Sequence, residues 1–479
     1  MNYRMVSYVL GWILIFEAIF MAVPLITSAF YAEGEAAVCF AATAAICLAI
    51  GFLLILVKKP QNKRLFSKEG FVIVALSWIA LSVFGALPFV FSGEIPSFID
   101  ALFETVSGFT TTGASILKDV EALPKSMLMW RSFTHWVGGM GVLVFVMAFL
   151  PLSGGQNMHI MKAESPGPSV SKLVPRVKTT ALLLYSIYFV LTLIEFVMLL
   201  FGGMSGFDAL NTAFATAGTG GFGIYNSSLG QFSPYIQNVV TVFMLLFSVN
   251  FNSYFFLINR KFREAFTTEV IMFFVIVAAA ISVITLDNRV LFESTGEALR
   301  HSAFTVASVI STTGFSTVDF NGWSELSRTI LVLIMFIGAC AGSTGGGIKV
   351  SRIIILFKSL GKELKVMVHP AQIKKIKIDK HPVEHETARS VSVFMVGYLV
   401  VFVISLIVIS FDNHDLITNF TAVTATINNI GPGLELVGPT ENFSFFSIPS
   451  KIVLIFDMLA GRLEIFPMLL LFTPSTWKK

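Results

Sequence analysis

Four times along this chain, an apolar stretch half the length of a membrane span runs into a short glycine-bearing polar loop, and a long hydrophobic segment follows. The four glycine loops are residues 110–114, 218–222, 311–315 and 428–432, and their glycines Gly113, Gly221, Gly314 and Gly431 recur at intervals of 108, 93 and 117 residues. Four loops can surround one axis, and rings of backbone carbonyl oxygens can replace the water around a cation. The pattern predicts a pore folded from a single chain.

The composition supports a membrane protein. Of 479 residues, 55% are hydrophobic and 13% are charged, and the mean hydropathy is +0.80. A soluble protein of this size could not bury so much apolar surface, so we expect an all-α polytopic membrane protein. Apolar windows of about 20 residues predict ten transmembrane spans, near 6–29, 36–57, 70–92, 126–151, 179–203, 233–258, 266–287, 324–358, 389–411 and 446–473.

The distribution of charge predicts the orientation. About 25 of the 33 Lys and Arg residues lie before the first span, after even-numbered spans or at the C-terminus, and residues 349–389 alone hold ten. Cytoplasmic loops carry this excess of cations. Both termini are therefore predicted to face the cytoplasm.

Each glycine loop follows a segment too short to cross the bilayer: 96–109, 206–217, 296–310 and 414–428. About 12 helical residues reach roughly 18 Å, whereas the hydrocarbon core is about 30 Å thick. All four segments fall on the outer side, which predicts a pseudo-fourfold axis along the membrane normal. The expected organisation is an N-terminal hairpin (1–65) followed by four helix, pore-helix, loop and helix repeats at 66–165, 166–264, 265–385 and 386–479.

The loops have the chemistry of a site for a monovalent cation. Glycine reaches positive φ without penalty, so successive carbonyls can turn toward one axis. None of the loops holds a carboxylate, which a divalent site would favour. The fourth loop differs in having Pro432 and no threonine, which predicts looser selectivity. The candidate potassium-binding residues are Thr111, Thr112, Gly113, Thr219, Gly220, Gly221, Thr312, Thr313, Gly314, Asn429, Ile430 and Gly431.

A second glycine-rich segment, 340–349, interrupts the last span of the third repeat. Its glycines cannot hold a continuous helix, since each costs about 1 kcal/mol relative to alanine. A Walker-type nucleotide loop is excluded because Ile348 occupies the place of the required lysine. A movable gate under the glycine loops and a static kink both remain open. The candidate gate residues are Gly342, Ser343, Thr344, Gly345, Gly346, Gly347 and Lys349, with Arg462 facing them.

Charged residues inside apolar segments allow two interpretations. Asp457, Arg462 and Glu464 share the last span, and intramembrane charges normally face a cavity or one another. Arg462 therefore either points into the pore, where it opposes cations, or pairs with a carboxylate on another helix. Arg131 and His135 are interpreted as anchors at the outer membrane interface.

Four stretches resemble the TrkH/TrkG branch of the Trk/Ktr/HKT superfamily of potassium transporters. They are residues 130–145 (WRSFTHWVGGMGVLVF), 338–349 (GACAGSTGGGIK), 428–433 (NNIGPG) and 461–464 (GRLE). The resemblance implies that the four glycines belong to a selectivity filter, that residues 342–347 form the gating loop and that Arg462 is the pore arginine. It also implies a homodimer on a separate cytosolic ring of RCK-type (TrkA-like) nucleotide-binding subunits. By the same resemblance, glycine rather than serine at position 113 favours potassium over sodium, and the chain is expected in a bacterial inner (plasma) membrane.

Potassium uptake driven by the membrane potential is the leading hypothesis, since one charge moving through 100 mV is worth about 2.3 kcal/mol. A proton- or sodium-coupled symporter and a poorly selective monovalent cation channel are the alternatives. We expect K⁺ as the transported ion, no covalently bound cofactor and no nucleic-acid partner. The basic region 358–380 is a candidate surface for the regulator or for lipid headgroups, or a solvated cytoplasmic loop. The chain shows no nucleophile–base pair, metal cluster or nucleotide motif, so it is not predicted to be an enzyme.

Overall fold

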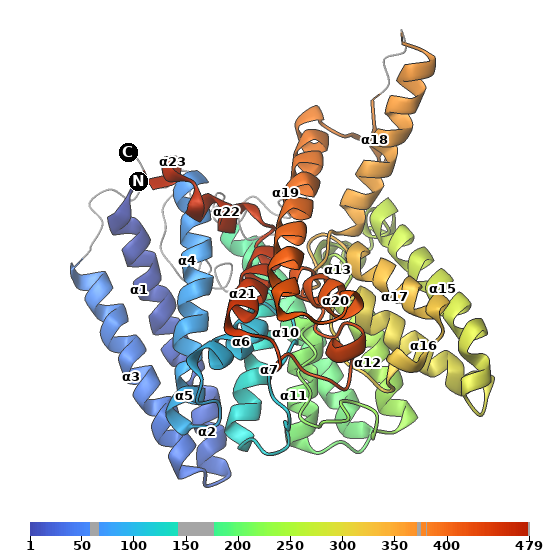
Figure 1. Ribbon diagram of the computed structural model, residues 1–479. Helices are drawn as coiled ribbons and strands as arrows, with labels where there is room; N and C mark the ends of the chain where they lie inside the picture. The colour runs from blue at the N-terminus through green and yellow to red at the C-terminus, as the bar shows by residue number, and fades with distance from the viewer. Residues whose placement is uncertain (58–66, 142–176, 371–374, 380, 478–479) are drawn as a thin grey trace.

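The computed structural model describes residues 1–57, 67–141, 177–370, 375–379 and 381–477 (Figure 1). These residues are mostly helical. Six helical segments are long and apolar enough to cross a membrane, and α12 and α13 form a bent pair that would make a seventh. The expected all-α membrane fold is confirmed at this level, and the described residues add one two-stranded antiparallel hairpin with Lys377 opposite Pro382.

The chain begins with a hairpin of helices: α1 (Tyr3–Phe20), α2 (Ala22–Phe30) and α3 (Gly34–Val57). Helices α1 and α3 cross at two glycines. A Cβ atom at Gly11 would lie 2.8 Å from the carbonyl oxygen of Gly51, and a Cβ at Gly51 would lie 2.8 Å from that of Gly11. The missing side chains allow the two backbones to touch, as small residues do where membrane helices pack.

The remaining helices repeat one order, in which a long helix precedes a short helix, a glycine loop and another helix. The helices around the first two loops are α4 (Ser67–Gly85), α5 (Leu87–Ser92), α6 (Phe98–Phe109) and α7 (Lys125–Gly139), then α10 (Val177–Phe201), α11 (Gly206–Gly218), α12 (Pro234–Phe247), α13 (Phe251–Ile258) and α14 (Phe262–Ala265). The elements around the last two are α15 (Thr268–Asn288), α16 (Thr295–Ile310), α17 (Glu325–Ile337), α18 (Val350–Val368), β1 (Lys377–Ile378) and β2 (His381–Pro382), then α19 (His385–Ile409), α20 (Leu416–Ile427), α21 (Ile448–Arg462), α22 (Phe466–Phe472) and α23 (Pro474–Trp477).

The four short helices α6, α11, α16 and α20 start in the same way. The residue before each is Ser97, Ser205, Ser294 or Asp415, and its side chain accepts a hydrogen bond from the backbone N–H three residues on. Such a cap satisfies one of the N–H groups that the first turn leaves without a partner. The four helices are 12, 13, 16 and 12 residues long, so each ends well short of a full membrane crossing.

Contacts between the units close a ring. Helix α7 packs against α11, α12 against α16, α17 against α20, and α21 against α6. In each pair, the helix after one glycine loop touches the short helix before the next loop, and the last pair joins the fourth unit to the first. The C-terminal ends of all four short helices are thereby brought together.

Four predicted spans are each divided between two helices, which was not predicted: α1 and α2, α4 and α5, α12 and α13, and α21 and α22. The hydropathy windows 233–258 and 446–473 gave no sign of an interruption, but α12 and α13 are bent by 93°. Helices α21 and α22 are separated at Glu464 and Ile465, which have φ of 56° and 69°. Hydropathy measures the length of an apolar stretch and does not depend on the direction of the backbone. The windows therefore gave no indication of a bend. The break between α17 and α18 falls in segment 340–349 as predicted, and the end of the window 126–151 lies outside the described residues.

The glycine crossing of α1 and α3 gives a stability prediction. Replacing Gly11 with alanine inserts a methyl group against the backbone of α3, and overpacking of this kind costs about 1–3 kcal/mol. We expect Gly11→Ala to lower the midpoint of thermal unfolding of the detergent-solubilised chain. Gly34→Ala is the matched control because a Cβ there meets no atom within 4 Å. Equal midpoints for the two variants would contradict the close crossing.

Candidate functional site

The four glycine loops share one backbone conformation. In each, the residue before the glycine donates its N–H at 2.9 Å to the carbonyl five residues earlier: Thr112 to Ser107, Gly220 to Ala215, Thr313 to Ser308 and Ile430 to Ala425. The residue two places before the glycine is left-handed, with φ of 56° at Thr111, 55° at Thr219, 60° at Thr312 and 54° at Asn429. The fourth loop therefore keeps the geometry of the others despite its sequence, and asparagine tolerates the left-handed region better than threonine does.

The glycines hold the loops against one another in a closed order. Their φ values are 81°, 73°, 88° and 96°, a region that favours glycine. A Cβ atom at each would collide with the carbonyl oxygen of the next loop: Gly113 with Gly220, Gly221 with Thr313, Gly314 with Ile430, and Gly431 with Thr112. The structure thus brings all twelve candidate potassium-binding residues into one cluster, around four carbonyl oxygens that come one from each loop.

Side-chain oxygens brace the loops. Thr110 and Thr112 share a hydrogen bond of 2.8 Å between their hydroxyls, and Ser311 and Thr313 share one of 2.6 Å. The amide of Asn429 donates to the Thr112 hydroxyl at 3.0 Å and to the Met458 carbonyl at 2.9 Å. Asn429 therefore links the fourth loop to the first and to α21, a contact that its place in an atypical loop did not suggest.

A buried ion pair lies behind the first loop. The Nε atom of Arg131 donates to Glu104 at 2.8 Å, and both side chains are almost fully buried. The Glu104 carboxylate also accepts from the Ser115 hydroxyl and from the Ile116 N–H, each at 3.0 Å. Arg131 donates in turn to the carbonyl of Gly223 at 3.1 Å. The pair therefore fastens the chain after the first loop to the chain after the second.

His135 joins the same two loops. Its Nδ1 lies 2.7 Å from the carbonyl oxygen of Gly108, and its Nε2 accepts from the N–H of Phe222 at 3.2 Å. This pattern requires a neutral ring with the proton on Nδ1. The interpretation of Arg131 and His135 as outer-interface anchors is therefore wrong, because both are buried against the glycine loops. Glu104 was missed altogether, although a carboxylate inside an apolar half-span was a signal that could have identified it.

Segment 340–349 lies directly against the third and fourth loops. The N–H of Gly346 donates to the Thr312 hydroxyl at 2.6 Å, and the N–H of Gly347 donates to the Asn428 carbonyl at 3.1 Å. A Cβ at Gly345 would lie 2.8 Å from the carbonyl oxygen of Ser311. The glycines therefore do more than interrupt a helix, because they allow the segment to touch the loops without intervening side chains.

Two cations hold this segment through its carbonyls. Arg462 donates to Thr344 at 2.7 Å and, through its other terminal nitrogen, to Gly138 and Gly139 at 2.5 and 2.6 Å. The Lys349 ammonium donates to the carbonyl of Gly345. Arg462 thus bridges segment 340–349 to the C-terminal end of α7, where the last helix carbonyls favour a positive charge.

The other charges of this span also have partners. Glu464 pairs with Arg352 of α18, whose guanidinium carbon lies 4.0 Å from the centre of the Phe394 ring. Asp457 accepts from the Ser405 hydroxyl at 2.7 Å and has no hydrogen-bond partner on its second oxygen among the described residues. Helix α21 therefore contacts the fourth glycine loop through the Met458 carbonyl, and Glu464, just beyond the end of α21, contacts the helix that follows segment 340–349.

A cavity of about 130 Å³ opens on one side of the loop cluster. All four glycines line it, together with Lys118, Arg131 and Glu441. Asp119 lies next to this rim outside the spans, and the side chain of Asn226 donates to it at 2.8 Å. That hydrogen bond lowers the pKa of Asp119.

Comparison with known proteins shows where this architecture recurs. Residues 37–479 match the model of the TrkH family, described as cation transport protein. The chain is 37% identical to the Trk system potassium uptake protein TrkH of Escherichia coli (strain K12) over the full length of both. It is 32% identical to TrkG of the same organism, with 99% of each chain covered. The crystal structure of the potassium transporter TrkH from Vibrio parahaemolyticus superposes with a TM-score of 0.89 over 100% of both chains, at 33% identity. The chain belongs to the TrkH family of cation transport proteins.

Proposed function

We propose that this chain carries K⁺ across the bacterial inner membrane through a pore at the centre of the four glycine loops. The closed order of the loops carries the proposal, because each glycine lies against the carbonyl oxygen of the next loop. Its relatives are named potassium uptake proteins. The family transports cations, so the function is transport rather than catalysis, with K⁺ as cargo and no cofactor.

The same contacts support a pseudo-fourfold arrangement. Four capped short helices end at four loops of one conformation, and each unit packs against the next around a ring. We infer ten transmembrane segments with both termini in the cytoplasm, divided at the boundaries that the sequence predicts. The partially negative C-terminal ends of the short helices then point at the centre, where they favour a cation.

Selectivity in this proposal comes from neutral carbonyls. The four loops contain no carboxylate, which suits a monovalent ion with a weakly held hydration shell. The fourth loop shares the backbone geometry of the first three. That observation argues against the poorly selective channel, which rested on the divergent sequence of the loop.

Segment 340–349 is the proposed gate. It contacts the third and fourth loops, and Arg462 and Lys349 hold it by hydrogen bonds to its carbonyls. Opening would require these bonds to break, which a cytosolic RCK-type nucleotide-binding subunit could drive through α18, the helix that starts directly after the segment. In this proposal, segment 340–349 controls the opening of the pore and the four glycine loops provide its ion selectivity.

A homodimer is the proposed assembly. Helix α18 exposes Phe357, Leu360, Leu364 and Met367, whose spacing of three and four residues is that of a helix–helix seam. In a symmetric dimer, these exposed apolar residues of α18 would pack against the same residues of α18 in a second copy.

Coupled symport remains the second candidate, and one observation favours it. Asp457 is fully buried in α21, next to the helix end that carries Arg462, and one of its oxygens has no hydrogen-bond partner among the described residues. Buried carboxylates of this kind serve proton relays in transporters. Asp457→Asn separates the two functions, since it would abolish proton-coupled uptake of rubidium and leave uptake driven by the membrane potential intact.

The filter assignment is tested at Gly113. A serine there places a side chain against the Gly220 carbonyl and disturbs one quarter of the ring. We expect Gly113→Ser to raise the Na⁺/K⁺ flux ratio in proteoliposomes by roughly tenfold, equivalent to about 1.4 kcal/mol of discrimination. Gly93→Ser is the matched control, because Gly93 also has positive φ (77°) but no atom within 4 Å of a Cβ. An unchanged ratio in Gly113→Ser would remove Gly113 from the filter.

The gate assignment is tested by shortening segment 340–349. Deletion of residues 345–347 removes the backbone that touches Thr312 and Asn428, so the basal rubidium flux without any regulatory partner should rise by well over tenfold. Flux equal to that of the unmodified chain would show that the segment is a static kink.

Arg462 provides a milder test of the same gate. Arg462→Ala removes the link between Thr344 and the end of α7, and charge-assisted hydrogen bonds contribute about 1.5–3 kcal/mol each. We expect at least a tenfold higher basal rubidium flux. Arg328→Ala is the control, since that arginine forms ion pairs with Glu325 and Glu435, away from segment 340–349. Similar flux in the two variants would argue against a role for Arg462 in closure.

A further inference from the structure

A lysine-lined cavity lies between α18 and the hairpin that follows it. Helix α18 extends away from the body of the molecule (Figure 1), and the cavity of about 650 Å³ opens along its C-terminal half. Of the described residues that line it, five are lysines and none is acidic; the lysines are Lys358, Lys362, Lys365, Lys375 and Lys377. This volume is typical of a site for a small molecule or a headgroup.

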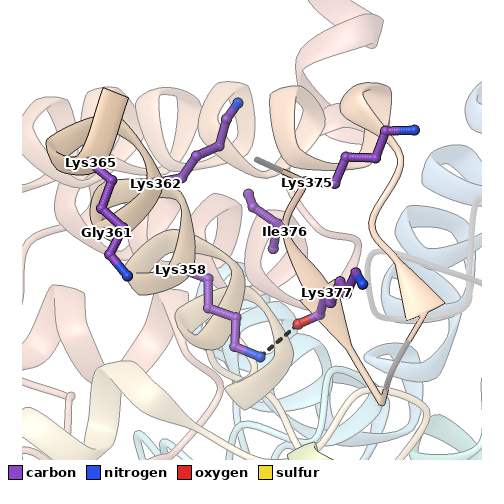
Figure 2. A pocket seen from close by; sticks show the side chains of 7 residues that line it. All are labelled: Lys358, Gly361, Lys362, Lys365, Lys375, Ile376 and Lys377. Atoms are coloured by element: carbon purple, nitrogen blue, oxygen red, sulfur yellow. Dashed lines mark hydrogen bonds between the residues drawn. The ribbon is translucent and has the colours of Figure 1, made fainter. Parts of the chain in front are cut away.

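The local structure explains why lysines gather there. Lys358, Lys362 and Lys365 are four and three residues apart, so they share one face of α18. Lys375 and Lys377 are two apart in extended chain, so they leave it on the same side. Lysines from two separate segments therefore line the cavity, and Figure 2 shows Ile376 between the two groups, with the side chain of Lys375 directed away from α18.

The hairpin that carries Lys375 and Lys377 is fixed in place. Lys358 donates from its Nζ to the carbonyl of Lys377 at 2.7 Å, which fastens β1 to α18 (Figure 2). The carboxylate of Asp379 accepts from the N–H of Thr268 at 2.8 Å and from its hydroxyl at 2.6 Å, which fastens the turn to the start of α15. Asp379 is therefore occupied elsewhere, and the cavity is formed before any ligand arrives, which lowers the entropic cost of binding.

The charges in the cavity are poorly compensated by the protein. Glu363 approaches Lys362 at 3.6 Å, but both side chains are substantially exposed, and such pairs are weak. The positive-inside rule explains lysines in a cytoplasmic segment. It does not explain why two segments place lysines around one cavity whose described lining contains no carboxylate. A ligand with several anionic oxygens would satisfy several ammonium groups at once, as phosphate does with clustered cations.

We propose that this cavity binds a phosphate-bearing anion, in the form of either a soluble pyrophosphate group or the headgroup of an anionic phospholipid. Along α18, Lys358 lies about 12 Å and Lys365 about 22 Å from Val350. If segment 340–349 lies near the middle of the bilayer, as the proposed function has it, the cavity runs from Lys358, just inside the hydrocarbon boundary at about 15 Å, to Lys365 at the outer edge of the headgroup layer. Both sources of phosphate can therefore reach it.

The test uses the full chain in two arms. In the first, inorganic pyrophosphate is titrated by calorimetry into the chain held in nanodiscs of phosphatidylcholine. In the second, native mass spectrometry counts the phosphatidylglycerol retained after exposure to mixed lipid. Lys362→Gln/Lys375→Gln removes one cavity lysine from each segment, and Lys362→Arg/Lys375→Arg keeps the charge. Lys261→Gln/Arg263→Gln is the matched control, because these exposed cations lie outside the cavity.

One ligand should bind per chain and weaken about tenfold in the double glutamine variant. The arginine variant and the control should bind as the unmodified chain does. Pyrophosphate binding identifies a soluble ligand, and retention of phosphatidylglycerol alone identifies a lipid headgroup. The proposal is overturned if neither ligand binds or if the cavity and control variants lose equal affinity. Because binding is read without flux, a failed pore assignment would leave this result unaffected.

Discussion

The arrangement of the molecule depends on four contacts in which a glycine lies against the carbonyl oxygen of the next loop. No side chain fits at any of these positions, and each glycine also has the positive φ that a larger residue rarely adopts. Both requirements act at one atom, so replacing a glycine would strain its own loop and displace the neighbouring one. The short helices, their caps and the helix pairs between units serve to bring these four backbones together.

Polar groups behind the loops maintain this approach. Glu104 and Arg131 connect the chain beyond the first and second loops, and His135 bonds to the backbone of both. Burying an ion pair carries a desolvation cost that only good geometry and further hydrogen bonds offset. Here Glu104 accepts additional bonds from Ser115 and Ile116. The network fixes the positions of the loops without placing a charge among their carbonyls, as the proposed filter for a monovalent cation requires.

Much of the fold was predictable because it follows from local patterns. Hydropathy located the long helices, half-length segments located α6, α11, α16 and α20, and the density of glycine located the break before α18. The break at 248–250 contains neither glycine nor proline, whereas the break at 463–465 is flanked by Gly461 and Pro467, a signal that hydropathy windows do not register. The burial of Arg131 and His135 was also missed. A charged residue near a helix end is normally interpreted as an interface anchor, and only the packing of neighbouring helices shows that it is buried.

The sequence by itself determined which residues form the four loops and that glycine must recur in each, since backbone conformation is a property of a few adjacent residues. Only the tertiary structure decided which carbonyl each glycine meets, how Asn429 joins the first loop to α21, and where Arg462 holds segment 340–349. These contacts join residues far apart in the chain, so they depend on the packing of whole helices. A divergent sequence such as that of the fourth loop can therefore adopt the shared geometry, because the surrounding ring constrains its backbone.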